Sequence, residues 1–538
     1  MAERQATAKM TRAQRMTLLA CILGSSTAFL DGTLVNVALP SIRADLGGGL
    51  ATQQWIVDAY LLTLGSLLLV GGSLGDILGR RRVFAVGVGG FGVASLLCAA
   101  APSAGLLIAA RALQGVAGAA LVPSTLALLM DTFGEGQRAA AIGAWTAWTG
   151  IATAAGPLAA GLLIELGSWR WIFVVNVPLV LVTLRLLAHA PRGVRASGGR
   201  VDWPGALLCA LGLGGPVFAL IEQPSYGWSS PRVWAVLVVG VAMLVVFVSW
   251  ERTSRSPMLP LALFRARNFA IGNLTTLLFY GSLNTLSFFL VVFLQQVAGY
   301  SPLDAGLALL PMSIITFALA TRFGALADRI GPRLFMGIGP IVAGAGVLLL
   351  LRAGAHAEYF GTLLPGILVF SLGLAATVAP LTAAVLGAVG AGHSGVASGT
   401  NNAVARVAGL VAIAAVGAVV AAHFAAGVQS RLDHGRPAAS PAALRQVRGR
   451  PFVIDASAFA PTERPAVRAA LVSSSLDSYR LAIEISAALA ILSGLLSLGG
   501  ISNRKHAPVP TQDGGGALTQ ACVAVGSGPP TAPSVAGV

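Results

Sequence analysis

Long apolar runs follow one another almost without interruption along this chain, and they constrain its fold more than any other feature. A helix that crosses about 30 Å of hydrocarbon needs roughly 20 apolar residues. The sequence predicts fourteen such spans, at 17–39, 54–74, 83–102, 105–127, 139–163, 171–190, 203–222, 232–250, 268–296, 303–325, 333–353, 358–386, 400–424 and 477–500. We therefore expect an all-α polytopic membrane protein.

Composition excludes a soluble globule. The 538 residues are 56% hydrophobic and only 10% charged, whereas charged residues make up about 25% of a typical soluble domain. The formal net charge of +15 would suggest nucleic-acid binding in a soluble protein. Here the arginines gather in alternate short loops, the pattern that orients a chain in a bilayer. This pattern predicts a protein of the cytoplasmic membrane with both termini in the cytoplasm, and no nucleic-acid partner.

An internal repeat divides the chain. The segment Gly72–Arg81 recurs as Gly324–Arg333, with both copies in predicted cytoplasmic loops. Parallel repeats of this kind indicate two six-helix halves with a substrate site between them. The predicted domains are a cytoplasmic N-terminus (1–16), a first half (17–190), a linker with two inserted helices (191–267), a second half (268–500) that includes a long extracytoplasmic loop (425–476), and a disordered cytoplasmic tail (501–538).

Ionisable residues inside the apolar runs are the candidate functional groups. Asp31 lies in the first run, Asp58 in the second and Arg111 in the fourth. A charged side chain in hydrocarbon costs on the order of 3 kcal/mol, so such residues usually mark an ion or proton path. Asp31 is either a carboxylate that gains and loses a proton or a permanent structural partner of Arg111. Asp58 is a second proton or cation site, a gate, or a solvated helix end.

Four motifs then carry a family resemblance. They occur in order along the chain: Leu30–Pro40, Gly72–Arg81, Arg111–Gly115 with Gly118, and Trp169–Pro178. The resemblance that they carry covers roughly residues 17–500. The chain resembles the major facilitator superfamily, specifically its fourteen-helix drug:proton antiporter branch (EmrB/QacA type). The resemblance implies the major facilitator fold, two parallel-repeat halves plus two inserted helices. A fifth-helix antiporter motif is only partial, because alanine stands at 152 and 160 where the branch usually has glycine.

The resemblance also implies roles for particular residues. Asn36 and Gln114 belong to the motifs that contain Asp31 and Arg111, so we expect them at the proton and substrate site. A cytoplasmic gate is expected from three groups in the first half and three in the second, namely Asp76, Arg80, Asp131, Asp328, Arg333 and Arg406. Close helix packing is expected at Gly150, Gly156, Pro157 and Gly161. The second loop motif departs from the first, with Pro332 in place of Arg80.

These features predict a transporter and not an enzyme. The sequence contains no G-x-x-x-x-G-K-[ST] pattern, which argues against ATP as the energy source. The four scattered cysteines indicate no metal site, and we expect no cofactor, with the proton as coupling ion. The predicted activity is proton-coupled efflux of lipophilic, often cationic drugs by a monomer. Two alternatives stay open: a dedicated exporter of one natural product, and a non-transporting membrane sensor or scaffold.

Overall fold

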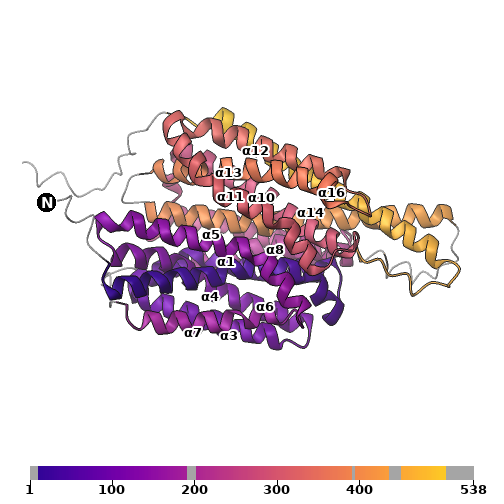
Figure 1. Ribbon diagram of the computed structural model, residues 1–538, viewed down its shortest axis with the longest axis horizontal. Helices are drawn as coiled ribbons and strands as arrows, with labels where there is room; N and C mark the ends of the chain where they lie inside the picture. Colours follow the sequence, from indigo (N-terminus) through magenta and orange to yellow (C-terminus); the bar gives the residue numbers. More distant parts are fainter. Residues whose placement is uncertain (1–9, 191–200, 390–393, 436–446, 448–449, 504–538) are drawn as a thin grey trace, which may run out of the picture.

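The computed structural model describes residues 10–190, 201–389, 394–435, 447 and 450–503, which form helices and contain no strand (Figure 1). The first group of helices is α1 (Arg12–Leu46), α2 (Leu50–Leu78), α3 (Arg80–Ala100), α4 (Ala104–Thr132), α5 (Glu135–Glu165), α6 (Trp171–Val174) and α7 (Asn176–Leu187). An inserted pair follows, α8 (Trp203–Tyr226) and α9 (Pro231–Thr253). The last group is η1 (Leu261–Arg265), α10 (Arg267–Gln296), α11 (Pro302–Ile330), α12 (Pro332–Leu349), η2 (Leu350–Arg352), η3 (Tyr359–Leu363), α13 (Leu364–Gly387), α14 (Ser394–Gly435) and α16 (Arg464–Gly500).

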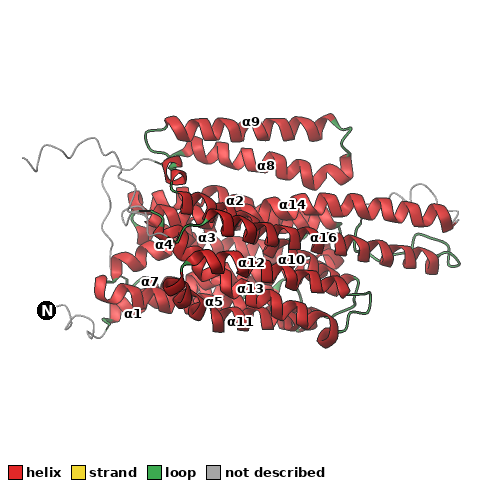
Figure 2. Ribbon diagram, turned by 90° about the horizontal axis from the view of Figure 1, so that it is seen from above, coloured by secondary structure: helices red, strands yellow, loops and turns green. Residues whose placement is uncertain are grey.

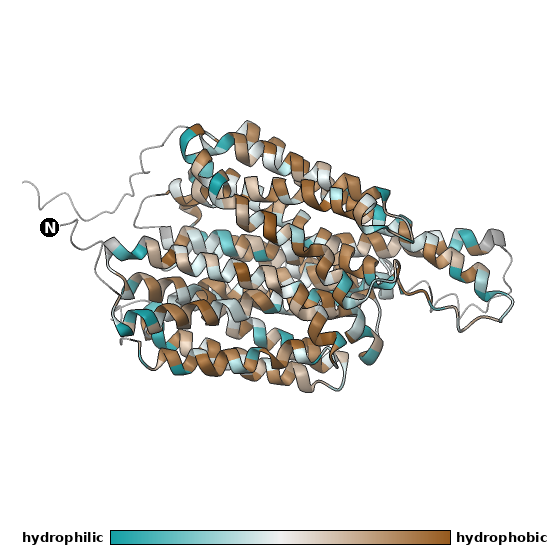
Figure 3. Ribbon diagram, viewed as in Figure 1, coloured by the Kyte–Doolittle hydropathy of each residue, from teal (hydrophilic) through white to brown (hydrophobic). Residues whose placement is uncertain are grey.

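The number of membrane-spanning helices agrees with the sequence. Within the described residues, 13 helices are long and apolar enough to cross a bilayer, and the shorter apolar segment Trp171–Leu187 supplies one more. Helix α9 is strongly apolar, yet only 17% of its most apolar stretch is buried in the protein. Large apolar side chains face outward in the same way on other helices, such as Val86 of α3 and Ile314 of α11, with 72% and 60% of their surface exposed. Hydrophobic residues predominate along the helices in Figure 3. An apolar outer surface of this kind faces lipid, so the protein is a multi-pass membrane protein.

The helices form two bundles with a seam between them. Helices α1 to α7 pack together as the first half, and α10 to α16 as the second (Figure 1). Along the seam, α5 packs on α11, α2 packs on α14, and α1 contacts α10. The inserted pair lies at the side of the bundle, where α8 contacts both α2 and α14 (Figure 2). The insert therefore covers the place where α2 and α14 meet.

The two ends of the bundle can be told apart by the chain ends. We call the end at which α1 begins and α16 finishes the terminal end, and the opposite end, where α1 leads into α2, the distal end. Helix α1 begins with a capping box, in which Thr11 Oγ1 accepts from the Gln14 backbone N–H and the Gln14 side chain accepts from that of Thr11. At the same end, Arg267 Nε donates to the Gly500 carbonyl over 2.7 Å.

The halves are joined at the distal end. The hydrogen bonds recorded between described residues of the two halves are Gln295 Nε2 to the Val37 carbonyl (2.8 Å), Gln296 Nε2 to Gln53 Oε1 (2.9 Å) and Gln54 Nε2 to the Ile413 carbonyl (2.6 Å). The first two link residues near the distal ends of α1, α2 and α10, and the third ties α2 to α14. The structure is therefore a state that is closed at the distal end.

The region predicted as a loop at 425–476 differs from the prediction. Helix α14 continues to Gly435 and α16 begins at Arg464, so much of this region is helical and extends past the other helices at the distal end (Figure 1). The reason is a small apolar core of its own, made of Phe424, Val428, Leu432, Val447, Phe459, Val467, Ala470 and Leu471. An ion pair also joins α14 to α16, with 2.5 Å between Arg431 Nη2 and Asp477 Oδ2. The predicted tail from 504 onward lies outside the described residues.

Small residues allow α5 and α11 to meet. A Cβ on Gly161 would lie 2.5 Å from Leu303 Cα, and one on Gly306 would overlap the Pro157 carbonyl oxygen. A Cβ on Gly156 would overlap Thr33 Oγ1 of α1. By contrast, Gly150 has only an ordinary 3.7 Å neighbour, Phe317. Three of the four predicted packing positions therefore lie in close helix contacts, and Gly150 does not.

We expect Gly161→Val to abolish or strongly reduce transport. The added side chain has no room against the Leu303 backbone, so α5 and α11 cannot approach as they do here. Uptake or efflux assays on matched amounts of membrane protein measure the effect. Gly143→Val is the control, because a Cβ at Gly143 meets nothing within 4 Å. Equal activity of the two variants would contradict the close-packing account of this seam.

Candidate functional site

A carboxylate and a guanidinium form a buried ion pair inside the first half. Asp31, midway along α1, has no exposed surface, and Arg111 of α4 is 1% exposed. The distance from Arg111 Nη1 to Asp31 Oδ2 is 2.5 Å. A buried charge that loses its partner is strongly destabilising, so each of these groups holds the other in place. The structure thus brings together the first two residues that the sequence singled out.

Two side-chain amides complete the coordination of Asp31. Gln114 Nε2 donates to Asp31 Oδ1 over 2.9 Å, and Asn176 Nδ2 of α7 donates to the same oxygen over 3.2 Å. Both amides also donate to Ser95 Oγ of α3, at 3.0 and 3.2 Å respectively. In every hydrogen bond recorded for Asp31, the carboxyl oxygen is the acceptor. The network therefore satisfies an ionised carboxylate, which has no proton to donate.

Arg111 extends the network to α2. Its Nε donates to the Ile56 carbonyl over 3.0 Å, and Nη1 also donates to Gln114 Oε1 over 2.6 Å. The guanidinium carbon lies 4.4 Å from the centre of the Tyr60 ring, within the range of a cation–π contact. The group connects α1, α2, α3, α4 and α7. A change of charge at Asp31 would therefore alter contacts among five of the seven helices of the first half.

Asn176 and Ser95 are members of this network that the sequence reasoning did not assign. Asn176 lies inside the quoted motif Trp169–Pro178, and its signal was available, since an amide in the middle of an apolar run needs a hydrogen-bond partner. Ser95 carries no such signal, because single serines occur in most of the runs. Its part in the network depends on how α3 packs beside α4 and α7.

Asp58 lies apart from the network and has no partner. Its side chain is fully buried, and neither carboxyl oxygen has a hydrogen-bond partner. The possibility that Asp58 is a solvated helix end is therefore wrong, because α8 and α14 cover this part of α2. Asn36 is also outside the network. Its Nδ2 reaches only the Gly32 carbonyl, at 3.5 Å, and its Oδ1 is unpartnered.

The charge cluster expected in the first half is present at the terminal end. Arg80 Nη2 lies 3.0 Å from Asp76 Oδ1, and Nη1 pairs with Asp131. Arg80 Nη1 also donates to the Ala127 carbonyl over 3.2 Å. The arginine thus joins the last turn of α2 to the last turns of α4. Side-chain exposures of 28% to 54% show that the cluster meets solvent.

The second half keeps one part of this arrangement and lacks another. Arg81 donates to the Ala190 carbonyl over 2.7 Å at the end of α7, and its repeat counterpart Arg333 donates to the Leu498 carbonyl over 2.6 Å near the end of α16. Each arginine satisfies free carbonyls at the end of the last helix of its own half. Asp328, however, forms no ion pair with any described residue, because Pro332 replaces the arginine. The charge network of the second half therefore differs from that of the first, as the departure at Pro332 predicts, and the gating roles expected of Asp328 and Arg333 stay predictions.

Arg406 lies further from the terminal end than expected. Its guanidinium is 5.6 Å from the ring centre of Phe29, next to Asp31 on α1, and its Cβ is 3.4 Å from a Cβ placed on Gly65. Both neighbours belong to the middle of their helices. The placement of Arg406 near the inner end is therefore wrong, since α14 enters the seam deeper than its sequence boundary suggested. It is a partly buried cation between the halves.

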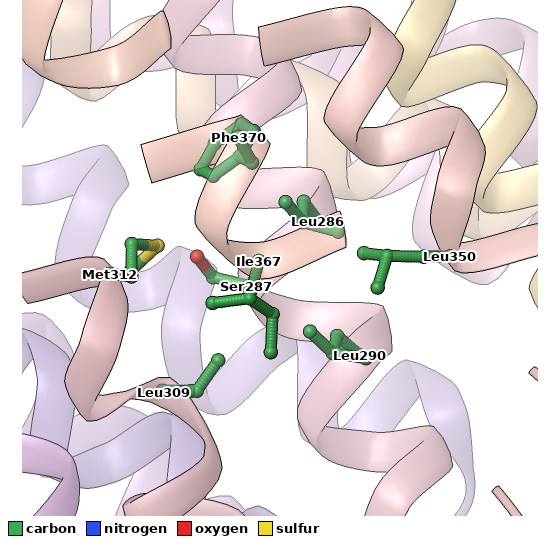
Figure 4. Close-up of a pocket in the computed structure, with 8 residues that line it drawn as sticks. All are labelled: Leu286, Ser287, Leu290, Leu309, Met312, Leu350, Ile367 and Phe370. Atoms are coloured by element: carbon green, nitrogen blue, oxygen red, sulfur yellow. The ribbon is translucent and has the colours of Figure 1, made fainter. Parts of the chain in front are cut away.

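One pocket lies within the second half. It has an empty volume of about 270 Å³, with lining residues Leu286, Ser287, Leu290, Leu309, Met312, Leu350, Ile367 and Phe370 (Figure 4). All of these come from α10, α11, η2 and α13, and only Ser287 is polar. A site for a drug-sized ligand needs several convergent polar groups. With a single polar lining residue, the pocket is too apolar to be a complete binding site in this state.

Comparison with known proteins decides the family. Residues 21–413 match the Major Facilitator Superfamily. This chain is a member of that superfamily of transporters. It is 40% identical over 425 residues to a puromycin resistance protein of Streptomyces alboniger, covering 77% of this chain and 82% of that protein. A multidrug resistance protein, Stp, of Mycobacterium tuberculosis is 34% identical, with 80% of each chain covered.

Further relatives agree on class and fold. A probable actinorhodin transporter of Streptomyces coelicolor is 35% identical over 79% of this chain and 75% of its own length. The crystal structure of a bacterial homologue of the human lysosomal transporter Spinster, inward-facing and unoccupied, matches with a TM-score of 0.61. That match covers 91% of this chain and 99% of the other at 16% identity, so it shows the fold alone. The predicted superfamily, its transporter fold and the exclusion of an enzyme are confirmed.

Proposed function

We propose that this protein exports lipophilic drugs or antibiotics, cationic ones among them, across the cytoplasmic membrane in exchange for protons. The observation that carries the proposal is the fully buried Asp31, held by Arg111, Gln114 and Asn176 within the bundle. Such an acid can couple proton binding to a change in helix packing, because neutralising it removes the reason for Arg111 to stay in place. The resistance relatives support drugs and antibiotics as the solute class.

The proposed cycle is alternating access. Facing the cytoplasm, the protein binds the solute while Asp31 is ionised. Facing outward, it takes up a proton at Asp31, releases the solute, and returns with the proton. One charge crossing about 100 mV releases about 2.3 kcal/mol, and one pH unit adds about 1.4 kcal/mol. Together they support a concentration gradient of roughly 500-fold for a neutral solute per proton.

The orientation follows the arginine pattern, with the terminal end in the cytoplasm. On this orientation the structure is closed to the outside. The partly exposed cluster of Asp76, Arg80 and Asp131 then lies at the cytoplasmic end of the first half. We propose that it acts as the inner gate, since ion pairs formed only in one conformer bias the equilibrium between two states.

For this gate we expect Arg80→Lys to lower transport several-fold with little loss of stability. Lysine keeps the charge but cannot bridge two carboxylates and a carbonyl as the planar guanidinium does. Because the cluster meets solvent, the thermal unfolding free energy should change by about 1 kcal/mol or less. Arg82→Lys is the control, since Arg82 forms no ion pair among described residues. Transport by Arg80→Lys equal to that by Arg82→Lys would argue against a gating role.

A second candidate is a dedicated exporter of one antibiotic. It is favoured by the relative that shares 40% identity, whose name specifies puromycin alone. Growth inhibition in a pump-deficient bacterial host, with and without expression, separates the two. The panel includes puromycin, tetracycline, spectinomycin, ethidium and a quaternary ammonium compound. Protection against several unrelated compounds supports a multidrug pump, protection against one supports a dedicated exporter, and protection against none contradicts both.

A further inference from the structure

Asp58 is a buried ionisable residue to which the proposed cycle gives no role. Its position follows from the helix repeat of α2. Gln54 precedes it by four residues and Gly65 follows it by seven, so all three lie on one face. Gln54 Nε2 donates to the Ile413 carbonyl of α14 over 2.6 Å, and Gly65 lies against Arg406 and Val407 of α14. Asp58 is thus enclosed between two contacts that join the halves.

The facing surface of α14 offers nothing to pair with a carboxylate. Between Arg406 and Ile413 the same face of α14 presents Leu410, which is fully buried. The charged or titratable groups on the elements packed against α2 have other partners or lie nearer one end of the bundle. Asp31 and Arg111 pair with each other, Glu222 accepts from Trp55, Arg406 lies over Phe29, the Tyr60 hydroxyl donates to the Ala28 carbonyl, and Cys21 and Cys98 donate to Thr125 and Gln114. Toward the distal end lie Arg43, Asp45, Tyr226 and His423, and toward the terminal end lie Arg80 to Arg82, Asp131 and Cys209.

The inserted helix α8 closes the lipid side. Trp55 Nε1 donates to Glu222 Oε1 over 2.9 Å and its ring lies 6.0 Å from Phe218, while Leu62 lies 3.4 Å from a Cβ placed on Gly214. Trp55 and Leu62 lie one turn to either side of Asp58 on α2. Water can therefore reach the carboxyl group only when α2 separates from α14.

We propose that Asp58 is a second proton-binding site, a latch that lets α2 and α14 close only when its carboxyl group is protonated. An ionised carboxylate with no donor and no cation among the described residues is strongly disfavoured, whereas a neutral carboxyl fits the same enclosure. On separation, water solvates the group and it ionises. The role of this latch in transport rests on the proposed alternating-access cycle. In that cycle, Asp58 must bind a proton from the distal side before the distal end can close.

The sign of the pH effect follows from this difference. The closed state binds one proton more than the open state, so raising the pH favours opening of the distal end. A single coupled proton changes the ratio of closed to open molecules by at most about tenfold per pH unit. Replacing Asp58 by a neutral side chain removes that dependence and leaves the distal end closed.

Distances between spin labels test the latch. Labels at Gly105→Cys in the first half and Gly354→Cys in the second lie at the distal end, where an added Cβ meets nothing within 4 Å. The background replaces the native Cys21, Cys98, Cys209 and Cys522 by alanine. Electron–electron double resonance on the full chain in lipid nanodiscs, between pH 5.5 and 8, should show a longer distance growing at the expense of the shorter one as the pH rises.

Substitutions at Asp58 show whether this residue, and not another titratable group, causes the pH response of the label distance. Asp58→Asn should hold the short distance at every pH, and Asp58→Glu should restore the response. Asp58→Thr serves the same purpose if the asparagine variant does not fold. A pH response unchanged in the neutral variants, or absent from the parent, would overturn the latch. The measurement uses neither solute nor gradient, so its failure is distinguishable from failure of proton-driven export.

Discussion

Arg111→Ala should leave little folded transporter in the membrane. The substitution strands the Asp31 carboxylate in a site with no exposed surface and removes the guanidinium contacts to Ile56 and Gln114. Breaking a buried pair in this way costs roughly 3–5 kcal/mol, a large share of the stability of a typical protein. The yield of monodisperse protein after mild extraction, together with its thermal unfolding midpoint, measures the loss.

Two controls make this prediction specific. The double variant Asp31→Asn with Arg111→Gln removes both charges, so it should recover most of the lost folding yet remain inactive. Arg170→Ala breaks the exposed ion pair with Asp45, whose side chains are 37% and 47% exposed, and should cost about 1 kcal/mol or less. A stable Arg111→Ala protein, or a double variant no more stable than the single one, would show that the buried pair does not hold these helices together.

Asp31→Asn alone should fail to export, with a smaller loss of folded protein than Arg111→Ala. Asparagine keeps the shape of the side chain, and its Oδ1 can still accept from Gln114 and Asn176. The variant leaves the Arg111 charge without its carboxylate, but the guanidinium still donates to the Ile56 carbonyl and to Gln114 Oε1. Asparagine cannot bind or release a proton near neutral pH, so a pump that depends on this exchange should fall to background. Cellular accumulation of a compound selected by the growth panel, compared at equal surface expression, measures the effect. Asp31→Glu should retain part of the activity, because it keeps a titratable carboxyl group.

The positions of the spans and of the main ion pair could be predicted from the sequence for simple physical reasons. A bilayer requires runs of about 20 apolar residues, so the runs are visible without any knowledge of packing. Asp31 and Arg111 interrupt such runs at similar depth, and opposite charges in hydrocarbon have to meet. Arg80 and its two acids lie at adjacent helix ends, which the topology alone brings together.

Other features could not be predicted because they depend on the rotation and depth of individual helices. The sequence placed Asp58 near the outer ends of the spans, but the inserted α8 and α14 enclose it. Arg406 lies deeper in the seam than its motif suggested, beside Phe29. The extension of α14 and α16 beyond the bundle depends on their own apolar core, whose members are separated by loops in the sequence.

The structure assigns opposite requirements to the two buried acids. Asp31 has donors on both oxygens and is satisfied as an ion, whereas Asp58 has none and fits only as a neutral group. Both occur in the same conformation, closed at the distal end. Proton exchange at Asp31 and the proposed latch at Asp58 can therefore be separated by variants at each position.

The most direct measurement of proton coupling at Asp31 is the collapse of a pH gradient across proteoliposomes. The vesicles contain a trapped pH-sensitive dye and a solute from the growth panel is added. Solute should accelerate the collapse with the parent protein and have no effect with Asp31→Asn at equal reconstitution. Solute-dependent collapse of the same rate in Asp31→Asn would contradict the account, because protons would then be exchanged for solute without this carboxyl group.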